Sequence, residues 1–199
     1  THLEVLATAA VRDASNADRL IQVINRAFGA PPRVLSGEEE ARYATLGVIY
    51  GKQNAEGLFA DLGGGSLELG LSENGPLTSL PIGVVRLREL SKGKTLKARK
   101  AVGKALKPVS FIERARGGTL HLVGGSWRHL AALHRLIRNE PLPQLIEGYS
   151  VDANKIRNFA GRVAREKPTR LKPYLRRPDR ASTLPFAALV LRRLIRQSG

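Results

Sequence analysis

The sequence has no cysteine and few aromatic residues, and both absences narrow what the protein can do. Without cysteine, disulfides and thiolate metal sites are excluded, and a reducing compartment, the cytoplasm, is the expected location. Four tyrosines, five phenylalanines and one tryptophan are too few for an extended platform that stacks on single-stranded nucleic acid. No apolar run reaches the ~18 residues of a membrane-spanning helix, so we expect no membrane partner.

Acidic residues are scarce in the second half of the chain. Residues 1–90 carry 8 Lys and Arg against 11 Asp and Glu, a net charge of −3, whereas residues 91–199 carry 25 against 6, a net charge of +19. A strongly basic half indicates a polyanionic partner, although a solvated basic surface without a partner is the alternative. Because aromatic residues are few, a nucleic-acid partner is not expected.

Strands and helices alternate along the 199 residues, which predicts an α/β protein of one large or two small domains. We expect Ser36 to cap a helix whose first turn contains Glu38, Glu39 and Glu40, and Gly29 to end the preceding helix. Expected helices cover residues 16–28, 36–50, 84–90, 126–137, 151–165 and 182–196. Expected strands cover residues 33–35, 58–62, 67–71, 77–82 and 119–123, and the lysine-rich residues 92–107 form an exposed helix or a linker.

A glycine-rich turn between two predicted strands is the main candidate for binding chemistry. Gly63, Gly64, Gly65 and Ser66 follow Asp61, and Glu68 comes shortly afterwards. Consecutive glycines permit unusual backbone conformations and let a ligand approach the N–H groups, which can together bind an anion. The alternative is an ordinary tight β-hairpin, and this local pattern alone does not decide between the two.

Five segments, in order along the whole chain, resemble the exopolyphosphatase and guanosine pentaphosphate phosphohydrolase family. They are ATAAVRDASN at residues 7–16, SGEEEA at 36–41, DLGGGSLE at 61–68, SLPIGVVRL at 79–87 and VGGSWR at 123–128. The resemblance implies an actin-like ATPase (ribonuclease H-like) fold, with parts of two domains and an active site in the cleft between them.

The same resemblance implies roles for individual residues. Glu40 would be the catalytic base that activates water, and Arg12 would bind the transferring phosphoryl group. Residues Gly63, Gly64, Gly65 and Ser66 would cradle phosphate oxygens, and Asp61 and Glu68 would hold Mg²⁺ or its water. These residue types suit phosphoryl transfer, since arginine binds phosphate as a permanently charged fork and Mg²⁺ needs few carboxylates.

The resemblance also predicts the domain organisation. Residues 1–45 would be the C-terminal part of the first actin-like domain and residues 46–168 the second. Residues 169–199 would be a basic segment and a helix that returns toward the first domain. The family's first phosphate loop, a DxGSNSxR-type segment, has no match here, so we expect a piece of a longer protein that is inactive or very weak alone.

The expected function is release of terminal phosphate from inorganic polyphosphate, and guanosine pentaphosphate is the alternative substrate. Polyphosphate is preferred because a long polyanion can use an extended basic surface, including the arginine-rich residues 170–180. A non-catalytic module that binds polyphosphate or nucleic acid, and a kinase or ATPase with a nucleotide at Gly124 and Gly125, remain alternatives. A homodimer is also left open.

Three further side chains have no expected part in catalysis. His129 and His134 are five residues apart, off the spacing of a helical metal pair, so we expect both to face solvent. Trp127 should pack at the base of its helix.

Overall fold

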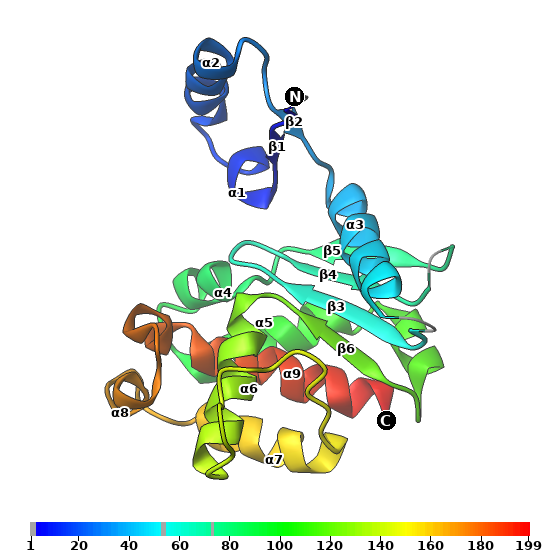
Figure 1. Cartoon of the computed structure of the whole chain (residues 1–199), viewed down its shortest axis with the longest axis vertical. Helices are drawn as coiled ribbons and strands as arrows, with labels where there is room; N and C mark the ends of the chain where they lie inside the picture. The colour runs from blue at the N-terminus through cyan, green and yellow to red at the C-terminus, as the bar shows by residue number, and fades with distance from the viewer. Residues whose placement is uncertain (1–2, 53–54, 73) are drawn as a thin grey trace.

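A mixed four-stranded sheet with helices on both faces forms most of the molecule, and a smaller N-terminal segment lies beside one face (Figure 1). The structure is a computed structural model that describes residues 3–52, 55–72 and 74–199. The sheet order is β5-β4-β3-β6, in which only β3 and β6 are parallel. The N-terminal segment has a separate parallel pair, β1 and β2.

The strands are β1 (Leu6–Ala7), β2 (Arg33–Val34), β3 (Leu58–Leu62), β4 (Leu67–Gly70), β5 (Leu77–Leu80) and β6 (Leu120–Val123). The α-helices are α1 (Ala9–Arg12), α2 (Ala17–Phe28), α3 (Gly37–Gly51), α4 (Val84–Leu90), α5 (Thr95–Leu106), α6 (Gly125–Ile137), α7 (Ala153–Val163), α8 (Pro168–Leu171) and α9 (Leu184–Ser198). Short 3₁₀ helices are η1 (Ser110–Ala115), η2 (Lys172–Tyr174) and η3 (Pro178–Ser182). The predicted elements are therefore present, and the lysine-rich stretch is a helix.

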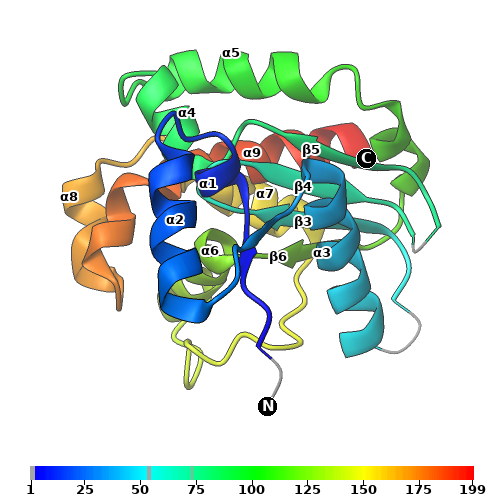
Figure 2. The same cartoon turned by 90° about the horizontal axis from the view of Figure 1, so that it is seen from above.

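The hydrophobic core lies on one side of the sheet. Helix α3 covers the face nearer the N-terminal segment, whereas α9 passes beneath the opposite face and packs against α5, α6 and α7 (Figures 1 and 2). Leu62 and Leu67 of the sheet, Leu130 of α6 and Leu191 of α9 are fully buried members of this core. All buried members of the core cluster come from residues 58–195.

The ends of two helices follow the local sequence closely. Ser36 caps α3 by accepting a hydrogen bond from the N–H of Glu39 at 3.1 Å, and the Glu39 carboxylate accepts one from the Ser36 N–H at 2.8 Å. This reciprocal pair is the predicted capping box. Gly29 ends α2 with a left-handed φ of 75°, as expected of a C-terminal glycine.

Helices α2 and α9 differ in how much of each is buried. Helix α2 has an apolar side, but none of its residues, all of which the structure describes, is buried, and Phe28 is 55% exposed. Helix α9 is the central helix beneath the sheet, and the prediction that residues 169–199 return toward the first domain stays a prediction. Ten buried residues along α9 explain its central position, since burial of so many apolar side chains outweighs any contact at the surface.

The expected domain boundary at residue 45 lies in the middle of α3. This helix continues from Gly37 to Gly51 and packs on β3, β4 and β5, so it belongs structurally with the sheet. The residues between β4 and β5, Glu73-Asn74-Gly75, are of a type that favours a hairpin turn, and Glu73 lies outside the described residues. The flanking strands β4 and β5 pair antiparallel as predicted.

Candidate active site

The glycine turn joins β3 to β4 and presents backbone N–H groups on one side. Gly63 N–H donates to the Ser66 carbonyl at 3.1 Å, which closes the turn. The carbonyls of residues 63–65 accept hydrogen bonds of 2.9–3.2 Å from the N–H groups of residues 83–86, at the start of α4. In a trans peptide the N–H points opposite to the carbonyl of the same unit. The N–H groups of residues 64–66 therefore all point away from α4.

These three N–H groups form a candidate cradle for an anion. Within residues 3–52, 55–72 and 74–199, no backbone or side-chain acceptor receives a hydrogen bond from Gly64, Gly65 or Ser66 N–H. Adjacent backbone donors that point the same way are a recurring phosphate-binding arrangement. Gly63 N–H is used within the turn, and phosphate binding by residues 63–66 stays a prediction.

Within this turn, lack of space favours glycine at Gly65, and the expectation of unusual dihedrals was wrong. Gly63, Gly64 and Gly65 have φ values outside the left-handed region. A Cβ on Gly65 would lie 3.3 Å from the Ala9 Cβ of α1, and a Cβ on Gly83 would lie 2.4 Å from the Gly64 carbonyl. Close approach to α1 and α4 therefore fixes where the turn sits.

Arg12 and Glu40 meet although 28 positions separate them in the sequence. The Arg12 guanidinium, at the end of α1, donates to the Glu40 carboxylate in the first turn of α3 and to the Leu35 carbonyl at 2.6 Å. The Glu40 side chain is 13% exposed and that of Arg12 is 26% exposed. Glu39 caps α3 and pairs with Arg33, which leaves Glu40 as the glutamate of this turn that faces the site.

Contacts connect this pair to the hairpin. A Cβ on Gly37, at the start of α3, would lie 2.6 Å from the Ser79 Cβ and 3.9 Å from an Arg12 guanidinium nitrogen. Ser79 Oγ in turn donates to Glu68 Oε1 at 2.8 Å. Glu68 lies directly opposite Asp61 in the register of β3 and β4. The structure thus brings together every predicted site residue, in one region at the end of the sheet.

Asp61 and Glu68 are carboxylates in a partly dry and negatively charged setting. Burial raises the pKa of Asp61, the charge of Glu40 raises it further, and Arg128 acts in the opposite direction. Burial likewise raises the pKa of Glu68; hydrogen bonds with Ser66 and Ser79 lower this pKa, and the charges of Glu40 and Asp61 raise it. Both groups would ionise more easily if a cation were bound nearby.

The carboxylates fit a sparsely coordinated cation better than a dedicated metal cage. In the part of the chain that the structure describes, no group of three or more Asp, Glu, His or Cys side chains is close enough to hold a metal ion. Mg²⁺ keeps several waters and is often bound by one or two carboxylates together with phosphate oxygens. Asp61 and Glu68 suit that mode of binding. The presence of Mg²⁺ itself stays a prediction.

The second glycine turn lies against the first. Gly124 precedes α6 with a left-handed φ of 107°, and a Cβ there would lie 2.8 Å from Asp61 Oδ1. Glycine is thus needed both for the backbone and for the approach to Asp61. Trp127 is buried at the base of α6 as predicted, and its Nε1 donates to the Ala187 carbonyl at 3.2 Å.

The expectation that both histidines of α6 face solvent was wrong for His134. It is 7% exposed, its Nδ1 lies 2.6 Å from the Tyr149 hydroxyl, and its ring contacts Phe159 edge-on at 4.8 Å between centroids. Burial lowers the pKa of His134. Helix α7 and residues 138–150 pack over this side of α6, and the sequence spacing of His129 and His134 does not predict that packing.

Sequence reasoning missed several residues of the site. Ser79 donates a hydrogen bond to Glu68. Arg86 of α4 forms an ion pair with Asp13, the residue after Arg12. The positive charge of Arg128 lowers the pKa of Asp61. All but Asp13 lie in segments 79–87 and 123–128, which carried the resemblance. Polar and charged residues at the ends of those segments were the signal that could have identified them.

Comparison with known proteins decides which family these features belong to. A model of the Ppx/GppA phosphatase family matches residues 1–197, nearly the whole chain. The chain belongs to the Ppx/GppA phosphatase family. A curated relative, a guanosine-5'-triphosphate,3'-diphosphate pyrophosphatase of Vibrio vulnificus (strain YJ016), is 38% identical over 103 residues, which is 49% of this chain and 21% of the relative.

Solved structures of Ppx/GppA proteins have the same fold. An exopolyphosphatase-like protein aligns with a TM-score of 0.80 at 23% identity, over 98% of this chain and 66% of the other. A family member from Aquifex aeolicus aligns with a TM-score of 0.71 at 24% identity, over the same fractions. The fold is therefore the predicted actin-like one. The chain spans about two thirds of these structures and about a fifth of the curated relative.

One general property of the described residues is also clear. None of the helices they form is both long and apolar enough to span a bilayer.

Proposed function

We propose that this Ppx/GppA chain carries the phosphate-binding and water-activating part of a hydrolase that releases terminal phosphate from inorganic polyphosphate. The observation that carries the proposal is the cradle of three unpaired N–H groups, residues 64–66, in the same region as Arg12, Glu40, Asp61 and Glu68. Backbone donors, an arginine and carboxylates are the groups that phosphoryl transfer requires.

The proposed step assigns roles to the cradle, Arg12 and Glu40. The N–H groups of residues 64–66 and the Arg12 guanidinium hold the oxygens of the terminal phosphoryl group. Glu40 removes a proton from a water molecule as the water oxygen bonds to phosphorus. The bond from phosphorus to the bridging oxygen breaks, and the shortened chain leaves with that electron pair. The hydrogen bond from Arg12 to Glu40 orients the carboxylate before the water arrives.

Mg²⁺ is the cofactor we propose for this site. Asp61 and Glu68 would hold it, largely through water, and the ion would neutralise negative charge on the phosphate oxygens. Burial raises the pKa of each carboxylate and the charge of Glu40 raises both further, so a bound cation would offset the negative charge between them.

Two substrates are compatible with this site. The net charge of +19 over residues 91–199 favours polyphosphate, because a long chain can contact an extended basic surface. The curated relative named for guanosine-5'-triphosphate,3'-diphosphate favours guanosine pentaphosphate as the second candidate. Competition between the two ligands for the same protein, with phosphate release as the readout, decides which is preferred.

The proposal is tested with Glu40→Gln, which keeps the shape of the side chain and removes the base. Phosphate release is measured with protein in excess over polyphosphate, so that a single turnover is detected. We expect release to fall by roughly 10²-fold or more, while polyphosphate affinity changes by less than about twofold. Glu38→Gln, in the same turn of α3 but exposed, is the matched control and should leave release unchanged.

Two results would contradict the proposal. Equal phosphate release from the parent chain and the Glu40→Gln variant would remove Glu40 as the base. Polyphosphate affinity that falls as far as phosphate release in the Glu40→Gln variant would assign Glu40 to substrate binding and not to water activation.

A further inference from the structure

The helices beneath the sheet carry a concentration of positive charge that the proposed active site does not use. Helices α5, α7 and α9 together contain ten Lys and Arg residues and no Asp or Glu. Helix α9 packs against both of the others. By contrast, three arginines of the arginine-rich residues 170–180 pair with Glu166 or Asp179; they are Arg170, Arg177 and Arg180.

A groove between α5 and α9 collects four of these arginines. Arg99 of α5 and Arg192, Arg193 and Arg196 of α9 line a cavity of about 160 Å³, and the other lining residues are aliphatic or glycine. Residues 192 and 196 are one turn apart, about 6 Å along the helix axis, so their charges form a row. Gln197 fixes the end of this groove, since its Nε2 donates to the Leu106 carbonyl at 3.0 Å.

Arg192 lies in this row with an Nε that has no partner among the described residues. Its Nε is inaccessible to solvent and has no hydrogen-bond acceptor among the described residues, and the same holds for Arg193 Nε. Gly161 of α7 makes room for the guanidinium, because a Cβ there would lie 3.2 Å from Arg192 Cζ. Burial and the charges of Arg165, Arg99, Arg196 and Arg157 all lower the pKa of Arg192. Holding a partly desolvated cation among like charges costs free energy unless an anion binds beside it.

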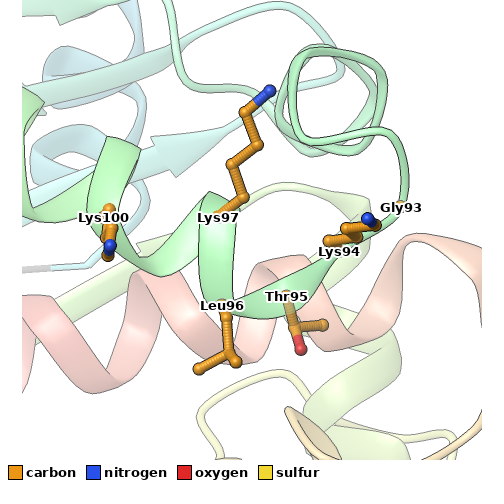
Figure 3. Close-up of a pocket in the computed structure, with 6 residues that line it drawn as sticks. All are labelled: Gly93, Lys94, Thr95, Leu96, Lys97 and Lys100. Carbon is orange, nitrogen blue, oxygen red and sulfur yellow. The ribbon is translucent and has the colours of Figure 1, made fainter.

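A larger hollow of about 490 Å³ at the start of α5 does not have this character (Figure 3). Lys94, Lys97 and Lys100 border it, but Figure 3 shows their side chains pointing in different directions. Three lysines that diverge do not converge on one ligand. The arginine groove is therefore the better candidate for a built anion site.

We propose that the groove between α5 and α9 binds a segment of an inorganic polyphosphate chain, separately from the active site. The choice of ligand rests on the function proposed above; the anionic class rests on the groove itself. Arginine forks match phosphate oxygens, and a chain charged at every phosphorus can neutralise neighbouring arginines at once. The groove is smaller than the roughly 300–1,000 Å³ of typical ligand pockets, and its lining has no aromatic residue. A thin chain therefore fits better than a nucleotide or a stacked single strand.

The test is the paired substitution Arg99→Gln and Arg196→Gln, made in the Glu40→Gln background so that the ligand is not consumed. Both positions are exposed, so folding should be preserved, and thermal unfolding checks this. We expect the affinity for long-chain polyphosphate at low salt to fall about tenfold or more. Orthophosphate affinity should not change, because the residues that hold a terminal phosphate are untouched. The matched control is Arg19→Gln with Arg26→Gln on α2, which removes the same charge and should change affinity by less than about twofold.

The outcomes separate this proposal from its alternatives. Unchanged affinity in the groove variant, or an equal loss in the control, would overturn the site. Single-stranded DNA of equal charge is the comparison ligand. If it binds the parent as tightly as polyphosphate does, and its affinity falls by the same factor in the groove variant, polyphosphate is not the specific ligand. A parent chain with no phosphate release, together with the expected loss of affinity in the groove variant, would leave this site standing and remove only the hydrolase function.

Discussion

Glu68 is 5% exposed and shares its surroundings with Glu40 and Asp61, so its ionisation opposes folding. Since the folded-state pKa is raised above the ordinary value of 4.5, the native protein binds more protons than the unfolded chain between the two pKa values. Stability is therefore lost as pH rises through this window. Glu68→Gln removes the titration and can still accept from Ser79. We expect the variant to match the parent near pH 4 and to be more stable at pH 7, by urea unfolding.

The exposed Glu38→Gln change is the control, since it removes the same charge away from Asp61. Its stability difference from the parent should not grow from pH 4 to pH 7. Mg²⁺ should stabilise the parent at pH 7 more than it stabilises Glu68→Gln. A stability difference for Glu68→Gln that is constant over pH would show that burial does not perturb this carboxylate.

Single residues of the site differ in how far the sequence could identify them. Glu39 was predictable as a cap, because Ser36 lies three positions before it and the contact is local. The pairing of Arg12 with Glu40 was not, because it depends on how α1 approaches α3. Glu40 and Arg12 were selected through the family resemblance, and their roles stay predictions. His134 shows the same limit, since its partner Tyr149 comes from a loop whose path has no local signal.

At the scale of elements, the start of α4 and the glycine turn form one unit. Gly83 N–H donates to the Gly65 carbonyl at 3.1 Å, and a Cβ on Gly83 would meet backbone atoms of residues 64 and 65 at 2.4 Å. Backbone cannot move aside as a flexible side chain can. We expect Gly83→Ala to lower the free energy of unfolding by about 2–3 kcal/mol and to weaken polyphosphate binding, measured by chemical denaturation and titration.

Gly47→Ala is the matched control for this change. Gly47 lies in the middle of α3 and a Cβ there would meet nothing within 4 Å. Alanine is the better helix former, so this variant should gain about 0.5–1 kcal/mol. If the two alanine variants proved equally stable, the hairpin and α4 would not be coupled as the structure indicates.

Helices and their ends were predictable because they depend on residues a few positions apart, as in α2, α3 and α6. Strand order was not predictable in this way. Phe59 of β3 pairs with His121 of β6, and no pattern in either strand specifies that partner. The location of α9 likewise results from burial of an apolar face beneath the sheet, which the sequence shows only as an apolar helix.

For the whole molecule, the distribution of the core predicts unequal local stability. All buried residues of the main core cluster come from 58–195, and α2, although twelve residues long, buries none. Leu20, Val23 and Phe28 of α2 are 47%, 55% and 55% exposed. An isolated helix of this length is marginal in water, so packing must supply most of its stability. Helix α9, with ten buried residues, should open only with the whole domain.

Native-state hydrogen exchange measures this difference directly. Amides in α9 should exchange with a free energy close to that of global unfolding, whereas amides in α2 should exchange at least ~10²-fold faster because local opening exposes little new apolar surface. Raising the protein concentration should not change α2 exchange if the chain is monomeric. Protection of α2 equal to that of α9 would contradict the prediction, and protection that grows with concentration would mean that a second copy covers Leu20, Val23 and Phe28.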